Sequence, residues 1–86
     1  MKPYDVIKYP FISEKVSARI ETDNTLVFVV DKRATKPMIK RAIEELYKMK
    51  VEYVRTAITS DGIKKAYVKF SKDTPALDLA TRLGVL

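Results

Sequence analysis

The stretch VEYVRTAITSDGIKKAYVKFS, residues 51–71, decides the fold of this chain. It holds two runs rich in β-branched and aromatic residues, Val51–Thr59 and Ile63–Ser71, joined by Ser60-Asp61-Gly62. An Asp-Gly pair between alternating runs is the strongest short-range signal for a β-hairpin. These residues therefore predict two neighbouring strands, which a hairpin can pair only in the antiparallel sense.

Pairing across a turn of even length predicts which side chains share a face of this hairpin. The predicted basic face combines lysines with a tyrosine and hydroxyls: Val54, Thr56, Ile58, Lys65, Tyr67 and Lys69. The predicted apolar face carries the other residues, with one cation among them: Tyr53, Arg55, Ala57, Ala66, Val68 and Phe70. Basic groups with an aromatic ring and hydroxyls suit a sugar–phosphate backbone.

Before the hairpin, a helix is predicted with Thr35 as its N-cap and Pro37 in its first turn. From Ile39 to Tyr47, apolar residues recur at helical spacing and form one stripe. The run Thr25–Val30 precedes this helix and is apolar on both parities. It predicts a central strand with both faces covered.

Both ends of the chain extend this pattern. The segment Met1–Tyr9 predicts a short strand that stops before a proline. Ser13 is the expected N-cap of a short helix through about Ile20, and Pro75 opens a terminal helix that Gly84 ends. The predicted fold class is α+β, in the order β-α-β-α-β-β-α, with helices packed on a four-stranded, mainly antiparallel sheet.

Composition narrows the class of protein. The length of 86 residues predicts one domain, spanning residues 1–86. The chain has no Cys and no His, which excludes disulfides, zinc fingers and thiol or imidazole catalysis. Its longest apolar run, Leu26–Val30, falls far short of the roughly 20 residues of a membrane span. We therefore expect an intracellular protein without a membrane span.

Enzymatic signatures are missing from the sequence. Glu44 and Glu45 point to different sides of a helix, and Asp61 and Asp73 stand where turns favour Asp. There is no Gly-rich phosphate loop and no nucleophile elbow. We therefore expect no catalytic activity, no cofactor, no metal and no small-molecule substrate.

The positive charge is concentrated in two clusters. The sequence holds 17 Lys and Arg against 11 Asp and Glu, a net charge of +6, which predicts a polyanionic partner. One cluster precedes and opens the predicted central helix: Lys32, Arg33, Lys36, Lys40 and Arg41. A helix start prefers carboxylates by about 0.3–1 kcal/mol each, so cations there indicate an external anion, such as phosphate on free backbone N–H groups.

The second cluster lies in the hairpin and just beyond it: Lys64, Lys65, Lys69 and Lys72. Lysines along a strand also serve as a solvated face, or guard an edge strand against aggregation. Charge alone leaves these alternatives open, and it does not distinguish RNA, DNA and an anionic membrane.

Five motifs, in order along the chain, add a family resemblance. They are Pro10-Phe11-Ile12-Ser13-Glu14-Lys15, Phe28-Val29-Val30-Asp31-Lys32, Ala34-Thr35-Lys36-Pro37-Met38-Ile39-Lys40 with Ala42-Ile43-Glu44, Val51-Glu52-Tyr53-Val54-Arg55-Thr56, and Lys64-Lys65-Ala66-Tyr67-Val68. With this order and spacing, the chain resembles the family of the universal large-subunit ribosomal protein twenty-three, in its short archaeal form.

The resemblance implies a structural protein in the cytoplasmic ribosome. Its implied partners are large-subunit rRNA near the exit of the nascent-peptide tunnel, neighbouring ribosomal proteins there, and factors that meet the emerging chain. Five residues fall on the family's basic motif positions: Lys36, Lys40, Thr56, Lys64 and Lys65. The charge pattern adds five more candidates for rRNA binding: Lys32, Arg33, Arg55, Tyr67 and Lys69.

A docking site is implied at Ser13, Glu14 and Lys15. Glu14 matches the position that bacterial members use to dock a ribosome-associated chaperone, and in an archaeal-type protein the analogous partner is the signal recognition particle. The turn Ser60-Asp61-Gly62 is too short to be the long tunnel-wall loop of bacterial members. Arg55 stands where many relatives have Asn.

Two alternatives remain at this point. The segment Ala66-Tyr67-Val68-Lys69-Phe70 matches the tail of a signature of RNA-recognition motifs, which would make the chain a stand-alone binder of single-stranded RNA. However, Lys64 and Lys65 replace the glycine and first aromatic of that signature, and the order of elements differs. The second alternative is a protein-docking adaptor that uses only Ser13-Glu14-Lys15.

Overall fold

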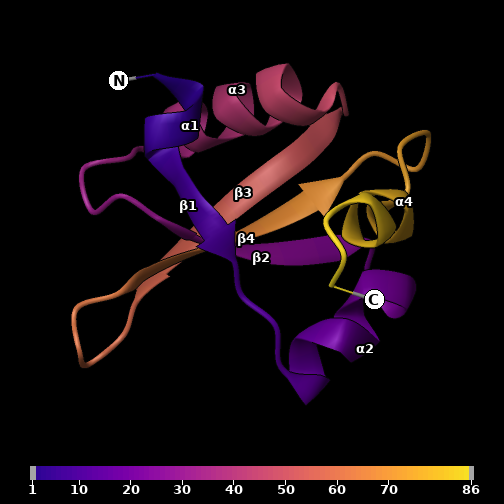
Figure 1. Cartoon of the computed structure of the whole chain (residues 1–86), viewed down its shortest axis with the longest axis horizontal. Coiled ribbons are helices and arrows are strands. Elements are labelled where there is room, and N and C mark those ends of the chain that lie inside the picture. The colour runs from indigo at the N-terminus through magenta and orange to yellow at the C-terminus, as the bar shows by residue number, and fades with distance from the viewer. Residues whose placement is uncertain (1, 86) are drawn as a thin grey trace.

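Four strands form one sheet in the order β1-β2-β4-β3, with every neighbouring pair antiparallel. Figure 1 shows this arrangement in the computed structural model, which describes residues 2–85. In chain order the elements are α1 (Pro3–Val6), β1 (Ile7–Pro10), α2 (Glu14–Thr22), β2 (Thr25–Val30), α3 (Lys36–Tyr47), β3 (Val51–Ile58), β4 (Lys64–Phe70) and α4 (Ala76–Arg82). The predicted fold class is confirmed.

The connection from β2 through α3 to β3 sets the architecture. Because β4 pairs antiparallel with both β2 and β3, these two strands run parallel to each other with β4 between them. The helix α3 therefore crosses one face of the sheet, where α1 packs beside it (Figure 1). This face holds the hydrophobic core.

The central strand β2 is buried throughout, as its apolar pattern predicts. Leu26, Phe28 and Val30 join the core cluster, together with Ile39 and Ile43 of α3. The Phe28 ring stacks on the Tyr47 ring at a centroid distance of 6.2 Å. Apolar residues of α4 and Ile20 of α2 complete the cluster, so the helices contribute their buried residues mainly to one side of the sheet.

Two helix starts follow the sequence signals. The Ser13 Oγ accepts a hydrogen bond from the Val16 N–H at 3.3 Å, and the Thr35 Oγ1 accepts one from the Met38 N–H at 3.3 Å. Both residues are therefore the N-caps that the sequence predicts. Within residues 2–85, no helix has the length and apolar character that crossing a membrane requires.

The predicted N-terminal strand Met1–Tyr9 is wrong over most of its length. Pro3–Val6 form the short helix α1, and β1 runs from Ile7 to Pro10; Met1 lies outside the described residues. Proline suits the first turn of a helix, and the Asp5 and Val6 N–H groups both donate to the Lys2 carbonyl. Pro10 is tolerated because β1 is an edge strand.

The predicted faces of β3 are also wrong, because the hairpin turn is odd in length. Thr59 and Ile63 close the hairpin through a 2.8 Å hydrogen bond from the Thr59 N–H to the Ile63 carbonyl. The loop between them has three residues and ends on Gly62, whose φ of +82° is the left-handed conformation that such loops use. Arg55 consequently pairs with Tyr67, not with a core residue of β4.

One residue of register moves every β3 side chain to the other face. Val54, Thr56 and Ile58 lie on the helix-covered face with Ala66, Val68 and Phe70, whereas Tyr53, Arg55 and Ala57 lie with the basic residues of β4, Lys65, Tyr67 and Lys69. The alternation of β4 itself agrees with the prediction.

Candidate nucleic-acid interface

The sheet face opposite α3 carries basic and aromatic side chains on its last two strands. We call it the open face and define it by Tyr53 and Arg55 of β3 and by Lys65, Tyr67 and Lys69 of β4. The valines of β2 that point to this side, Val27 and Val29, pair with Tyr67 and Lys65 and are buried. A buried apolar strip on β2 therefore borders the open face.

Cations and rings alternate on the open face. The Arg55 guanidinium lies 5.9 Å from the Tyr67 ring centroid, and the Lys69 ammonium lies 5.8 Å from that of Tyr53. The Lys65 ammonium sits closer, 3.7 Å from the centroid of Phe11. These cation–π contacts hold three positive charges above the sheet in defined positions.

Two hollows continue the open face toward α2. Both are lined by Arg19 of α2 together with Arg55 and Tyr67. The first also contains Asp23, which pairs with Arg19 at 3.9 Å, and the second reaches Ser13 and Lys15. Apart from Asp23, the described residues that line these hollows include no carboxylate, so their charge favours an anion.

A second basic surface lies on the other side of the edge strand β3. We call it the α3 surface and define it by Lys36, Lys40 and Thr56. Lys36 and Lys40 line a shallow hollow with Val54, whose side chain shares the helix-covered face of β3 with Thr56. Both lysines are exposed, and the first turn of α3 has no acidic residue.

The backbone of α3 contributes less to anion binding than its charge pattern predicts. Pro37 has no N–H, the Met38 N–H donates to Thr35 Oγ1, and the Ile39 N–H donates to the Thr35 carbonyl at 2.9 Å. The expectation of phosphate on several free N–H groups is therefore wrong. Lysine side chains are therefore the main groups of the α3 surface that an anion can contact.

Lys32 and Arg33 occupy the loop before α3. Arg33 forms an ion pair with Asp31, with 3.1 Å between Nε and Oδ1, and this hydrogen bond lowers the pKa of the Asp31 carboxyl. The positive charge of Arg33 is therefore partly neutralised within the chain. Lys32 is exposed, and its ammonium approaches the hairpin turn at Gly62.

Lys64 has a structural partner. It lies on the helix-covered face, where its ammonium donates to the Ala34 carbonyl at 2.6 Å and to the Lys32 carbonyl at 3.5 Å. Lys64 therefore fastens the start of β4 to the loop that leads into α3.

Replacing Lys64 by Met is expected to loosen this loop. Methionine keeps the apolar stem and removes the ammonium, so the unfolding free energy should fall by about 1.5–3 kcal/mol, as for a lost hydrogen bond to a charged group. Thermal unfolding measures the loss, and hydrogen exchange at Ala34 and Thr35 should accelerate. Lys65→Met is the matched control on the open face; equal stability of both variants would contradict the role of Lys64.

The predicted docking residues lie at the start of α2. Glu14 and Lys15 are exposed, whereas the Ser13 hydroxyl is engaged as N-cap. Ser13 and Lys15 also line one hollow of the open face, and Glu14 does not. The structure therefore brings part of this segment to the edge of the basic surface.

Sequence reasoning missed one residue of the open face, Tyr53, and two residues of the adjoining hollows, Phe11 and Arg19. Tyr53 was expected to pack in the apolar face, and Phe11 and Arg19 were assigned no role. The i,i+4 spacing of Lys15 and Arg19 on one helix could have indicated that the two cations share a side.

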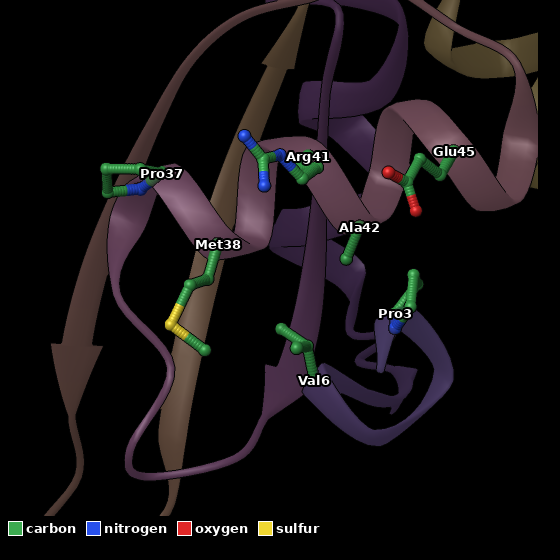
Figure 2. A pocket seen from close by; sticks show the side chains of 7 residues that line it. All are labelled: Pro3, Val6, Pro37, Met38, Arg41, Ala42 and Glu45. Atoms are coloured by element: carbon green, nitrogen blue, oxygen red, sulfur yellow. The ribbon is translucent and has the colours of Figure 1, made fainter. Parts of the chain in front are cut away.

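A further hollow lies between α1 and α3 and shares Pro37 with the hollow of the α3 surface (Figure 2). Met38 and Ala42 of α3 point toward Val6, while Arg41 and Glu45 mark its polar edge. Its two charged lining residues have opposite signs, so this hollow lacks the character of a phosphate site.

Comparison with known protein families supports a nucleic-acid interface. The family model described as Ribosomal protein L23 matches residues 5–77. The matched range contains all the candidate residues of the open face, the α3 surface and the segment Ser13–Lys15.

Proposed function

We propose that this chain, which belongs to the ribosomal protein L23 family, holds large-subunit rRNA through two surfaces. These surfaces are the open face and the α3 surface. Members of this family are non-enzymatic structural proteins that bind rRNA in the large ribosomal subunit. The observation that carries the proposal is the position of β3, an edge strand with Arg55 on one face and with Lys36 and Lys40 of α3 beside the other. Such an edge can enter a folded RNA and contact it on two sides.

The binding mechanism is electrostatic and geometric. Exposed Lys and Arg side chains displace counterions from phosphates, and the rigid sheet fixes the distances between them. Folded RNA is recognised largely by its shape and backbone, which suits a surface of fixed cations. Lys36 and Lys40 supply charge on one side, and Arg55, Lys65 and Lys69 supply it on the other.

Lys32, Arg33, Lys64 and Thr56 complete the proposed interface in other roles. Lys32 adds an exposed positive charge beside the hairpin turn. Arg33 adds the part of its positive charge that the ion pair with Asp31 does not neutralise. Lys64 positions the loop before α3. Thr56 offers a partly exposed hydroxyl on the α3 side of β3.

We also propose that the protein is of the short archaeal type and lies beside the exit of the nascent-peptide tunnel, among neighbouring ribosomal proteins. The three-residue hairpin turn supports the short form, since it leaves no long loop between β3 and β4. In this position Ser13, Glu14 and Lys15 would offer a docking surface to the signal recognition particle. The exposure of Glu14 and Lys15 at the start of α2 supports this role.

Salt dependence tests the electrostatic mechanism. If five cations each neutralise one phosphate, the slope of log K against log salt for an rRNA fragment should be about −4. Fluorescence anisotropy of a labelled fragment over a range of potassium chloride concentrations measures this slope. A nearly flat plot would contradict the mechanism.

Sedimentation separates the ribosomal function from the alternatives. A core component stays with the large subunit through a high-salt wash, whereas an adaptor that docks through residues 13–15 or a free RNA binder washes off. We expect the protein to remain in the subunit fraction. Quantitative recovery in the supernatant would favour one of the alternatives.

A further inference from the structure

We infer that the open face binds unpaired nucleotides, whose bases stack on Tyr67 and Tyr53 and whose phosphates contact Arg55 and Lys69. The inference rests on the proposed function and specifies the part of the RNA that reaches this face. The α3 surface, which has cations but no exposed ring among its defining residues, would contact backbone alone.

The sheet register places the two tyrosines for this role. Tyr67 lies directly opposite Arg55, and Tyr53 lies directly opposite Lys69, so each ring has a cation at its side. The two ring–cation pairs follow each other along the same two strands. Diagonal neighbours of this kind lie about 7–8 Å apart, which allows successive bases of one strand to use both rings.

Both rings are accessible to solvent. Tyr53 is 44% exposed and Tyr67 is partly exposed, on a face where no core residue covers them. The cations lie 5.8 and 5.9 Å from the ring centroids, at the outer limit of a cation–π contact, so a base can displace them from the rings at little cost. Phe11 differs, because the Lys65 ammonium at 3.7 Å occupies one face of its ring.

The chemistry of the open face favours single strands over duplex. A protein recognises an RNA duplex through phosphates and 2′-hydroxyls, which requires no aromatic rings. Rings interleaved with cations are typical of surfaces that stack splayed bases while they hold the backbone. The two hollows around Tyr67 are lined by Arg19 and Arg55, and so add charge beside the stacking positions.

A titration followed by NMR tests the inference on the intact protein. The probes are a short RNA of alternating adenosine and cytidine, which cannot pair with itself, and an RNA duplex of the same length. With the single strand, ring-current effects should shift the ring protons of Tyr67 and Tyr53 upfield. With the duplex they should not, at equal phosphate concentration.

Variants supply the second measurement. The double variant Tyr53→Leu, Tyr67→Leu should bind the single strand at least roughly tenfold more weakly, because stacking on each ring is lost. The double variant Tyr53→Phe, Tyr67→Phe keeps the rings and should retain affinity. Tyr4→Leu, at a 63% exposed tyrosine on α1, is the control outside the open face and should change nothing.

The outcomes separate the inference from the proposed function. Unshifted tyrosine resonances with the single strand, or wild-type affinity of the leucine variant, would overturn the inference, and the wild-type titration decides even where a variant fails to fold. If the wild-type protein itself washes off the large subunit, the proposed function fails whatever the tyrosines do. If it stays but the tyrosines do not respond, only the inference fails.

Discussion

Replacing Lys36 and Lys40 together by glutamate is expected to abolish incorporation of the protein into the large subunit while the fold persists. The substitution removes two phosphate contacts and adds two repulsions, so affinity for an rRNA fragment should fall at least roughly 100-fold. The salt slope should become shallower by about 2 units. Anisotropy titration and sedimentation of assembled subunits measure these effects.

The stability of this variant should change in the opposite direction from its binding. Both lysines are exposed and lie in the first turns of α3, which has no acidic residue in its first turn. Carboxylates near a helix N-terminus are favourable by about 0.3–1 kcal/mol each. Thermal unfolding should therefore show an equal or slightly higher Tm, and a large drop would mean that the lysines are structural.

A matched control separates site from net charge. Lys50→Glu with Lys72→Glu changes the net charge by the same amount at exposed positions. Lys50 precedes β3 and Lys72 follows β4, so both lie at the end of the hairpin opposite its turn. This control should keep most of the affinity. If it loses as much as the Lys36, Lys40 variant, overall charge and not the α3 surface governs binding.

Local signals predicted most of the fold, because they depend on few neighbouring residues. The caps at Ser13 and Thr35 and the wholly apolar Thr25–Val30 segment have the predicted structural roles. For the N-terminal segment, the local signals predicted the wrong structure. Its alternation resembles a strand, but Pro3 and the burial of Val6 against the core favour a helical turn.

The features that the sequence did not predict depend on the number of residues in the hairpin loop or on contacts between residues far apart in the sequence. Whether the hairpin loop has two or three residues decides every face of β3, and Asp61-Gly62 fits both lengths. Asn24 is the example that depends on distant partners. In the structure its amide donates to the Phe70 and Ser71 carbonyls at 2.9 and 3.0 Å and accepts from the Ala76 N–H, joining three elements far apart in sequence.

The candidate site shows the same division. Charge clustering indicated the basic residues, and alternation along β4 separated Lys65 from Lys64, but only the register brings Arg55 beside Tyr67. The sequence therefore predicted most residues of the two candidate surfaces and not the arrangement of these surfaces on either side of β3.

Replacing Phe28 by alanine is expected to have the largest effect on stability. Phe28 is 0% exposed at the centre of β2, where its ring stacks on Tyr47. A buried Phe→Ala change costs about 3–5 kcal/mol. At roughly 0.05–0.15 kcal/mol per residue, a chain of 86 residues has only about 4–13 kcal/mol in total. Urea unfolding should therefore show a much lower midpoint and a measurable unfolded population.

The same substitution at Phe11 is the control, since that ring is only partly buried on the other face of the sheet. Phe11→Ala should lose clearly less stability than Phe28→Ala. Equal losses at the two positions would contradict the assignment of the core to the helix-covered face.

Adding an rRNA fragment should distinguish the loss of stability in Phe28→Ala from the loss of RNA binding in the Lys36, Lys40 variant. Phe28→Ala leaves every proposed RNA contact in place, so RNA that binds the folded state stabilises it by mass action. At a concentration 100 times the dissociation constant, the gain is about 2.7 kcal/mol, which offsets most of the damage. Circular dichroism of Phe28→Ala should therefore recover toward the wild-type spectrum on titration with RNA. The Lys36, Lys40 variant is already folded and should show no such recovery, because what it lacks is the contact itself.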